Sequence, residues 1–117
     1  MSLNIQYMTI YQQINELLKD QVGCEIKSSE VKSQLFEKHG TNPSSIMLYD
    51  YCYNRINDGT AFDRHIFQYI SPGIYRYLGE NYPFSGAIIH KPHGQNTEKV
   101  VGEWKNGVKI RFESENN

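Results

Sequence analysis

Residues 65–78 read His-Ile-Phe-Gln-Tyr-Ile-Ser-Pro-Gly-Ile-Tyr-Arg-Tyr-Leu, with two strand-like runs on either side of a short turn. Both runs, 65–70 and 74–78, are rich in β-branched and aromatic residues, which fit a pleated sheet. Ser71-Pro72-Gly73 supplies turn chemistry, because Pro fixes φ and Gly accepts a positive φ. The stretch therefore predicts an antiparallel hairpin.

Two helices and a short strand are predicted before this hairpin. Residues 24–26 alternate as a single edge strand does. The hydroxyl of Ser28 or Ser29 can cap the helix that follows, and Gly40 suits its end. Each helix therefore buries one stripe of side chains. The stripes are Tyr7, Ile10, Ile14, Leu17 and Leu18 in the first helix, and Val31, Leu35 and Phe36 in the second.

A third helix is predicted over residues 43–57. Thr41-Asn42-Pro43 offers a capping side chain followed by Pro at the first helical position, where no amide partner is lost. The three-residue connection from Gly40 is the length of a helix-turn-helix turn. One face of this helix is predicted to be core and carries Ile46, Tyr49, Cys52, Tyr53 and Ile56, and the opposite face carries Ser44, Met47, Tyr51, Asn54, Arg55 and Asp58.

The last third of the chain predicts a second small sheet. Residues 86–90 form one strand, and 100–104 and 108–112 flank Lys105-Asn106-Gly107. Asn-Gly favours a tight hairpin, because both residues tolerate positive φ. In the last strand Val108, Ile110 and Phe112 point one way, and Lys109 and Arg111 point the other. We expect this sheet to extend the first hairpin or to pack beside it.

The element order predicts an α+β fold, a winged helix-turn-helix (helix-strand-helix-helix-hairpin) with a C-terminal β-hairpin extension. The chain of 117 residues is short for two domains. We expect a single domain over 1–117, with a winged-helix core at 5–80, the β extension at 81–112 and a tail at 113–117.

Two stretches carry a resemblance to known domains. Residues 67–78 resemble the wing of winged-helix domains found in bacterial restriction and other DNA-acting proteins and in some eukaryotic chromatin factors. Residues 50–57, Asp-Tyr-Cys-Tyr-Asn-Arg-Ile-Asn, are similar to a stretch of poorly characterised bacterial domains, some of which accompany nuclease domains. The resemblance implies DNA binding by a small bacterial or phage protein, a regulator or recognition module, with Asn54 and Arg55 on the recognition helix.

The expected mechanism places the third helix in the major groove and the wing on the flanking backbone of double-stranded DNA. Asn pairs with adenine, and Arg pairs with guanine or a phosphate. The expected DNA contacts are Ser44, Tyr51, Asn54, Arg55 and Arg76, with Arg64 and His65 as weaker candidates. A monomer would bind weakly, so a homodimer is expected.

The charge balance keeps a second function open. Phosphate affinity comes mostly from Lys and Arg, yet the net charge is −1. Residues 1–50 hold four basic and six acidic side chains, and residues 51–112 hold eight and five. The alternative is a protein-interaction module without DNA binding, whose C-terminal hairpin lends an edge strand to a protein partner.

Other classes of function lack a motif in the sequence. A metal site at His90 and His93 with Glu98 or Glu103 has loop spacing rather than the helical HExxH spacing, and no nucleophile, phosphate-loop or dinucleotide motif is present. We therefore expect no enzyme activity, no cofactor and no metal. No apolar run is long enough to span a membrane. Cys24 and Cys52, without a secretory signal, predict reduced, buried thiols in a cytoplasmic protein.

Overall fold

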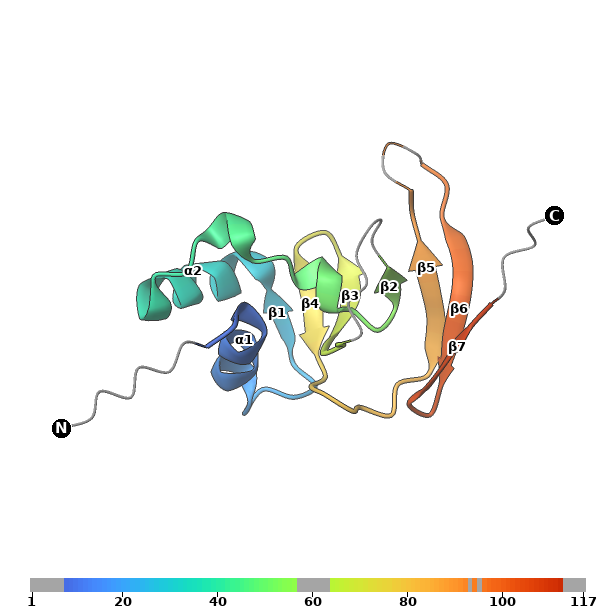
Figure 1. Cartoon of the computed structure of the whole chain (residues 1–117), viewed down its shortest axis with the longest axis horizontal. Helices are drawn as coiled ribbons and strands as arrows, with labels where there is room; N and C mark the ends of the chain where they lie inside the picture. The colour runs from blue at the N-terminus through green and yellow to red at the C-terminus, as the bar shows by residue number, and fades with distance from the viewer. Residues whose placement is uncertain (1–7, 57–63, 93, 95, 113–117) are drawn as a thin grey trace.

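The computed structural model describes residues 8–56, 64–92, 94 and 96–112 and arranges them in two sheets, with the helices against the first (Figure 1). In chain order the elements are α1 (Ile10–Leu18), β1 (Glu25–Lys27), α2 (Ser28–His39), the 3-10 turns η1 (Pro43–Ser45) and η2 (Leu48–Tyr51), β2 (Arg55–Ile56), β3 (Phe67–Ser71), β4 (Ile74–Tyr77), β5 (Gly86–His90), β6 (Lys99–Lys105) and β7 (Val108–Arg111).

The first sheet has the strand order β1-β4-β3 and is antiparallel throughout. The predicted hairpin of residues 65–78 is confirmed, because β3 and β4 pair directly, and Gly73 takes a φ of 78° in their turn. Helices α1 and α2 contribute to the core under this sheet. The buried side chains of this first core are Tyr11, Ile14, Leu18, Ile26, Val31, Leu35, Ile46, Leu48, Cys52, Ile66, Phe67, Tyr75 and Tyr77.

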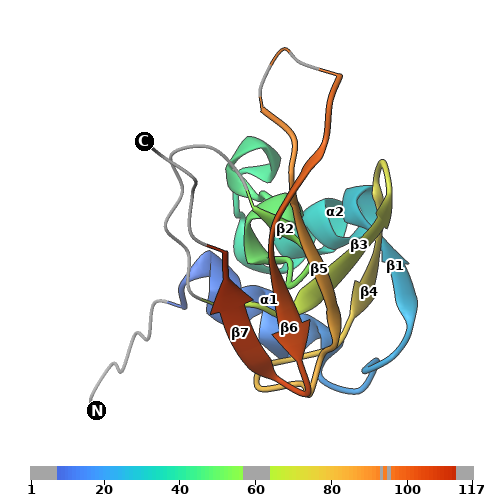
Figure 2. The ribbon, with the colours of Figure 1, turned by 90° about the vertical axis from the view of Figure 1, so that its right-hand side faces the viewer.

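The second sheet has the strand order β2-β5-β6-β7, with β2 parallel to β5 and the other pairs antiparallel. The predicted Asn106-Gly107 turn is confirmed: the two residues take φ values of 47° and 84° between β6 and β7. In Figure 2 strands β5, β6 and β7 lie in front of the helices. The strand order makes β2 and β7 the two edges of this sheet. The buried residues of this second core are Tyr53, Leu78, Phe84, Ile88 and Trp104.

The winged helix-turn-helix prediction is wrong. Residues 43–56 form η1, η2 and the short strand β2 instead of a third helix, so the chain has no recognition helix there. The described residues also form seven strands in two sheets rather than a helical domain with one wing. Asn57, at the end of the predicted third helix, lies outside the described residues, as do Tyr7 and the predicted tail at 113–117.

Packing explains why this segment is not helical. Cys52 is buried in the first core, whereas its neighbour Tyr53 is buried in the second. Adjacent side chains point to opposite sides in an extended chain and not in a helix. The signals at the start of the segment are real but local: the side chain of Asn42 caps η1, with Pro43 at its first position, and the 3-10 turn ends after Ser45. Tertiary burial therefore decides the conformation after Ser45.

Three smaller predictions from the sequence are also wrong. Helix α2 begins at Ser28 itself, its N-cap residue is Lys27, and no side chain caps it. Phe36 is 58% exposed instead of lying in the buried stripe of α2. Cys24 is exposed, although Cys52 is buried as expected and both thiols are free. The predicted C-terminal stop of α2 is confirmed, because Gly40 takes the left-handed conformation there.

Candidate functional site

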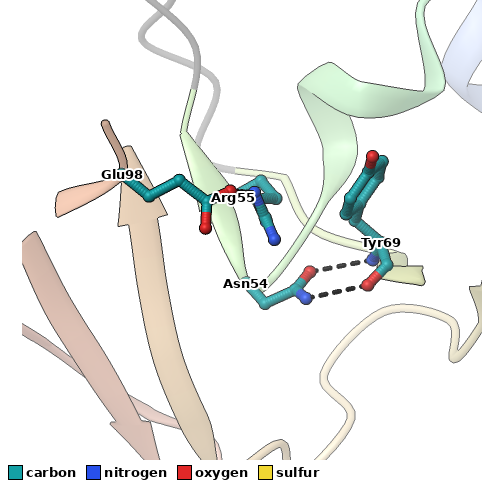
Figure 3. Close-up of polar contacts among 4 residues, drawn as sticks. All are labelled: Asn54, Arg55, Tyr69 and Glu98. Carbon is teal, nitrogen blue, oxygen red and sulfur yellow. Dashed lines mark hydrogen bonds and ion pairs between the residues drawn. The ribbon is translucent and has the colours of Figure 1, made fainter. Parts of the chain in front are cut away.

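Asn54 and Arg55, the leading predicted contacts, meet at Tyr69 of β3. The Asn54 amide nitrogen donates to the carbonyl oxygen of Tyr69 at 3.0 Å, and its oxygen accepts from the Tyr69 amide at 2.8 Å (Figure 3). The Asn54 side chain thus pairs with β3 much as a neighbouring strand would. Both of its polar atoms are used inside the protein, which gives it a structural role.

Arg55 is also engaged within the chain. Its Nη1 donates to Oε2 of Glu98 at 2.8 Å, and the guanidinium carbon lies 4.6 Å from the centroid of the Tyr69 ring (Figure 3). The side chain is only 17% exposed, because it lies between β3 and the segment that leads into β6. Stacking on an aromatic ring and pairing with a carboxylate are the contacts that a guanidinium makes well inside a protein.

The other three predicted contacts have partners elsewhere. The Ser44 hydroxyl and amide both donate to the side-chain oxygen of Asn42, at 2.9 and 3.0 Å. The Tyr51 ring packs 5.4 Å from the ring of Tyr11, so this residue is half-buried. Arg76 pairs with Glu25 of β1 at 3.0 Å and donates to Gln68 of β3 at 3.4 Å. The structure therefore brings Asn54 and Arg55 together on Tyr69, and it gives Ser44, Tyr51 and Arg76 separate partners.

The apolar side chains of β7 lie on the outer side of the second sheet. Cross-strand pairing places Lys109 opposite Trp104, and Arg111 opposite Gly102. Trp104 belongs to the second core, so Lys109 faces the protein, while Arg111, on the same side of the strand, is exposed. Val108 and Ile110, with Phe112 directly after the strand, consequently face outward, and the three are 62%, 39% and 49% exposed. We call these three side chains the β7 apolar row.

Lys109 is held in place on the inner side of the sheet. Its Nζ lies 3.3 Å from Nε2 of His65 and 5.8 Å from the centroid of the Trp104 ring. Nδ1 of His65 lies 3.0 Å from the carbonyl oxygen of Cys52. A carbonyl only accepts and an ammonium only donates, so these two contacts fit a neutral His65 with its proton on Nδ1. Lys109 is thereby held by His65, which is far away in the chain.

Strand β7 is also an edge of its sheet. In the described part of the chain it pairs with β6 alone. An edge strand presents backbone N–H and C=O groups that have no partner in the sheet. The alternation of residues 108–112 is visible in the sequence, but the side that the apolar residues face depends on pairing with β6 and on Trp104.

A crevice opens where the two sheets meet. Its volume is about 150 Å³, and it continues into a shallow groove along α1 through the shared residues Tyr11, Arg64 and Glu80. Burial raises the pKa of the Tyr11 hydroxyl, and the neighbouring Glu80 carboxylate raises it further. Sequence reasoning did not identify this crevice, because its side chains come from five separate segments. The crevice is lined by Tyr11, Tyr53, Arg64, His65, Glu80, Asn81, Tyr82, Trp104 and Gly107.

Among the described residues, no three His, Cys, Asp or Glu side chains are grouped as metal ligands would be. His93, part of the candidate metal site weighed in the sequence, lies outside the described residues. No helix in the described ranges is long and apolar enough to cross a membrane.

Comparison with known proteins gives two matches of unknown function. A family model described as a domain of unknown function, DUF7225, matches residues 9–111. The uncharacterized protein YnaC of Bacillus subtilis (strain 168) is 51% identical over 102 residues, which cover 87% of this chain and 39% of YnaC. The chain thus spans about two fifths of the length of this relative. No solved structure matches the chain significantly.

Proposed function

The chain belongs to the DUF7225 family, and we propose that it is a protein-interaction module that accepts a partner strand along β7. The β7 apolar row carries this proposal. An amphipathic strand normally buries its apolar side, whereas this one exposes Val108, Ile110 and Phe112 and turns Lys109 toward the protein. Strand addition would place the apolar side chains of the partner beside the apolar row and complete the backbone pairing in one step.

The charges on β7 define the chemistry of the partner strand. Residues directly opposite each other on paired strands interact, and opposite charges there are favourable. A strand beside β7 would meet Lys109 and Arg111 on one face and the apolar row on the other. The matching partner alternates acidic residues with apolar ones.

A second copy of this chain fits less well. If two β7 strands paired antiparallel around Ile110, Lys109 of each would lie opposite Arg111 of the other. Like charges that are directly opposite destabilise a strand pair. The proposed occupant is therefore a strand of a different protein, with acidic residues at alternate positions.

Synthetic peptides test this proposal directly. The probe is the heptapeptide Thr-Val-Glu-Val-Glu-Val-Thr, and the matched control replaces both glutamates with lysines. Amide hydrogen exchange is followed at residues 108–112 as peptide is added. We expect the acidic peptide to protect these amides and the basic peptide to leave them unchanged, because only the former places carboxylates opposite the basic side chains of β7.

Protein variants locate the binding. The substitution Ile110→Lys adds a charge to the centre of the β7 apolar row and should abolish protection by the acidic peptide. Phe36→Lys is the matched control, since Phe36 is an exposed apolar residue on α2. Equal protection by both peptides, no protection at all, or an equal loss in both variants would each overturn strand addition at β7.

The other function predicted from the sequence, DNA binding, stays a prediction. Its proposed mechanism needs a helix over residues 43–57 that the chain does not form. The five predicted contacts are also occupied by partners within the protein.

A further inference from the structure

Hydrogen bonding between β6 and β7 shows which backbone groups of β7 point to the open edge of the sheet. The amide of Phe112 donates to the carbonyl oxygen of Val101 at 3.0 Å, so the backbone groups of Phe112 point toward β6. In an antiparallel pair the hydrogen-bonded positions alternate along each strand, and the register is regular from Val108 to Arg111. The N–H and C=O groups of Lys109 and Arg111 therefore point away from β6, toward the position of an added strand.

A strand that pairs antiparallel to β7 would place a side chain directly beside Lys109. Hydrogen-bonded residues lie opposite each other with Cα atoms about 5.5 Å apart, and their side chains share one face of the sheet. Lys109 faces inward, because it lies opposite Trp104 of the second core. The partner residue opposite Lys109 would consequently point to the inner side as well.

The ring of His65 lies on this inner side, in contact with Lys109. Nζ of Lys109 is 3.3 Å from Nε2 of His65, and Nδ1 is 3.0 Å from the carbonyl oxygen of Cys52. Nδ1 carries a proton both in the neutral tautomer that these contacts fit and in the charged ring. Protonation therefore changes only Nε2, from an acceptor to a donor. A carboxylate is the group that matches such a donor.

The described charges around His65 leave an excess of positive charge. The titratable and charged side chains that line the crevice with His65 are Tyr11, Tyr53, Arg64, Glu80 and Tyr82. Burial raises the pKa of the Tyr11 and Tyr53 hydroxyls, which favours their uncharged forms. Arg64 and Glu80 carry opposite charges, so together with Lys109 they sum to one positive charge. A carboxylate brought to Lys109 would offset it.

We propose that binding of an acidic partner strand at β7 is coupled to protonation of His65. The coupling rests on the strand addition proposed above and regulates it. The partner carboxylate opposite Lys109 pairs with Nζ. Because such a pair brings N and O to about 2.8 Å, the carboxylate lies within about 6 Å of Nε2 of His65. An opposite charge at this separation favours the protonated ring, so a proton from solvent binds Nε2 while Lys109 donates to the carboxylate instead.

The direction of the pH dependence follows from the proton that the complex takes up. The ring of His65 binds its proton more strongly beside the carboxylate than in the free protein. Binding and protonation therefore favour each other. The affinity for an acidic strand rises as the pH falls through the range in which histidine titrates, around pH 6.5. Below about pH 5 the glutamates of the partner begin to protonate and the gain is lost.

The acidic heptapeptide Thr-Val-Glu-Val-Glu-Val-Thr tests the coupling through calorimetric titrations at about pH 7.5 and about pH 5.5. We expect roughly fivefold tighter binding at the lower pH, since a nearby opposite charge changes the proton affinity of a group by about tenfold or somewhat less when solvent is close. Titrations near pH 6.5 in two buffers of different ionisation enthalpy should show uptake of a fraction of a proton for each peptide bound.

A substitution locates the proton. His65→Gln removes the titrating ring and should bind the peptide with equal affinity at both pH values. His39→Gln is the matched control, because His39 is an exposed histidine at the end of α2, and it should keep the rise in affinity. Thermal unfolding at both pH values checks that each protein is folded. The proton uptake is measured on the unaltered protein, so it decides the question even if His65→Gln is unstable.

The outcomes separate the coupling from the strand addition. Protection of the amides of residues 108–112 at both pH values, with an affinity that is constant or falls on acidification and with no proton uptake, would overturn the coupling and leave strand addition standing. An undiminished rise in affinity in a folded His65→Gln variant would also overturn it. Absence of protection at either pH would overturn both proposals.

Discussion

Asn54 supports the backbone of β3 with both polar atoms of its amide, so its removal has a defined cost. Asn54→Ala leaves the amide and the carbonyl of Tyr69 without these partners. These hydrogen bonds are part-buried, so water can replace some of what is lost, and we expect the unfolding free energy to fall by about 1 kcal/mol. Chemical denaturation followed by circular dichroism measures it.

The control for this prediction is Asn96→Ala, because Asn96 is exposed in the segment before β6. Its unfolding free energy should stay within about 0.5 kcal/mol of the unaltered protein. If Asn54→Ala were as stable as Asn96→Ala, Asn54 would not act as a structural residue, and its side chain would be available for a ligand.

The two cysteines differ in a way that their sequence context does not reveal. Burial raises the pKa of the Cys52 thiol, although the charge of Arg55 opposes this, whereas Cys24 is exposed. The thiolate is the reactive form, so a raised pKa leaves little of it at neutral pH. We expect maleimide to label Cys24 rapidly in the native protein and to label Cys52 only in denaturant. Peptide mass spectrometry identifies the site, and rapid native labelling of Cys52 would contradict its burial.

At the scale of elements, the pairing of β6 with β7 depends on Gly102. A Cβ atom built on Gly102 would lie 2.6 Å from the carbonyl oxygen of Ile110, which is closer than real contacts allow. Gly102→Ala must therefore push the two strands apart, at a cost of about 1–3 kcal/mol. We expect lower thermal stability and faster amide exchange in β7.

Val108→Thr is the control for this prediction, because Val108 is the most exposed residue of the β7 apolar row and Thr keeps the β-branched shape. Its stability should change by less than about 0.5 kcal/mol. Unchanged exchange in β7 of Gly102→Ala would show that the strand pair adjusts without separating.

The distance along the chain between an element and the residues that determine it explains which elements could be predicted from the sequence. Both hairpins have their turn residues next to their strands, so Pro72-Gly73 and Asn106-Gly107 predict them locally. The segment after Pro43 begins with an equally clear helix signal and still is not a helix. Its conformation is decided by Cys52 and Tyr53, which enter different cores built from distant residues. The helix propensity of the segment does not reveal that these two residues are buried in different cores.

At the scale of the whole molecule, the candidate sites depend on the second sheet lying against the first. Trp104 of β6 donates to the backbone of Tyr53, and Ile89 of β5 donates to the backbone of Asn54. Trp104 and Tyr53 both line the crevice, and the inner position of Trp104 sets which side of β7 faces outward. The sequence shows that Val108, Ile110 and Phe112 share one side. Which of the two sides of β7 faces the protein is determined by the packing of the two sheets.

Charge is the other property of the whole molecule, and it predicts how the protein behaves toward nucleic acid. The chain has 12 basic and 13 acidic residues, and the Arg55 and Arg76 guanidiniums are paired with Glu98 and Glu25. Binding to DNA scales with the number of phosphates that are neutralised, with a slope in log salt of about −0.9 for each. Titration of labelled random duplex DNA at low salt should therefore give no saturable binding. Saturable binding that weakens steeply as salt is added would mean that several phosphates are contacted. Asn54, Arg55 and Arg76 would then have to exchange their internal partners for DNA, and the structure of the complex would differ from that of the free protein.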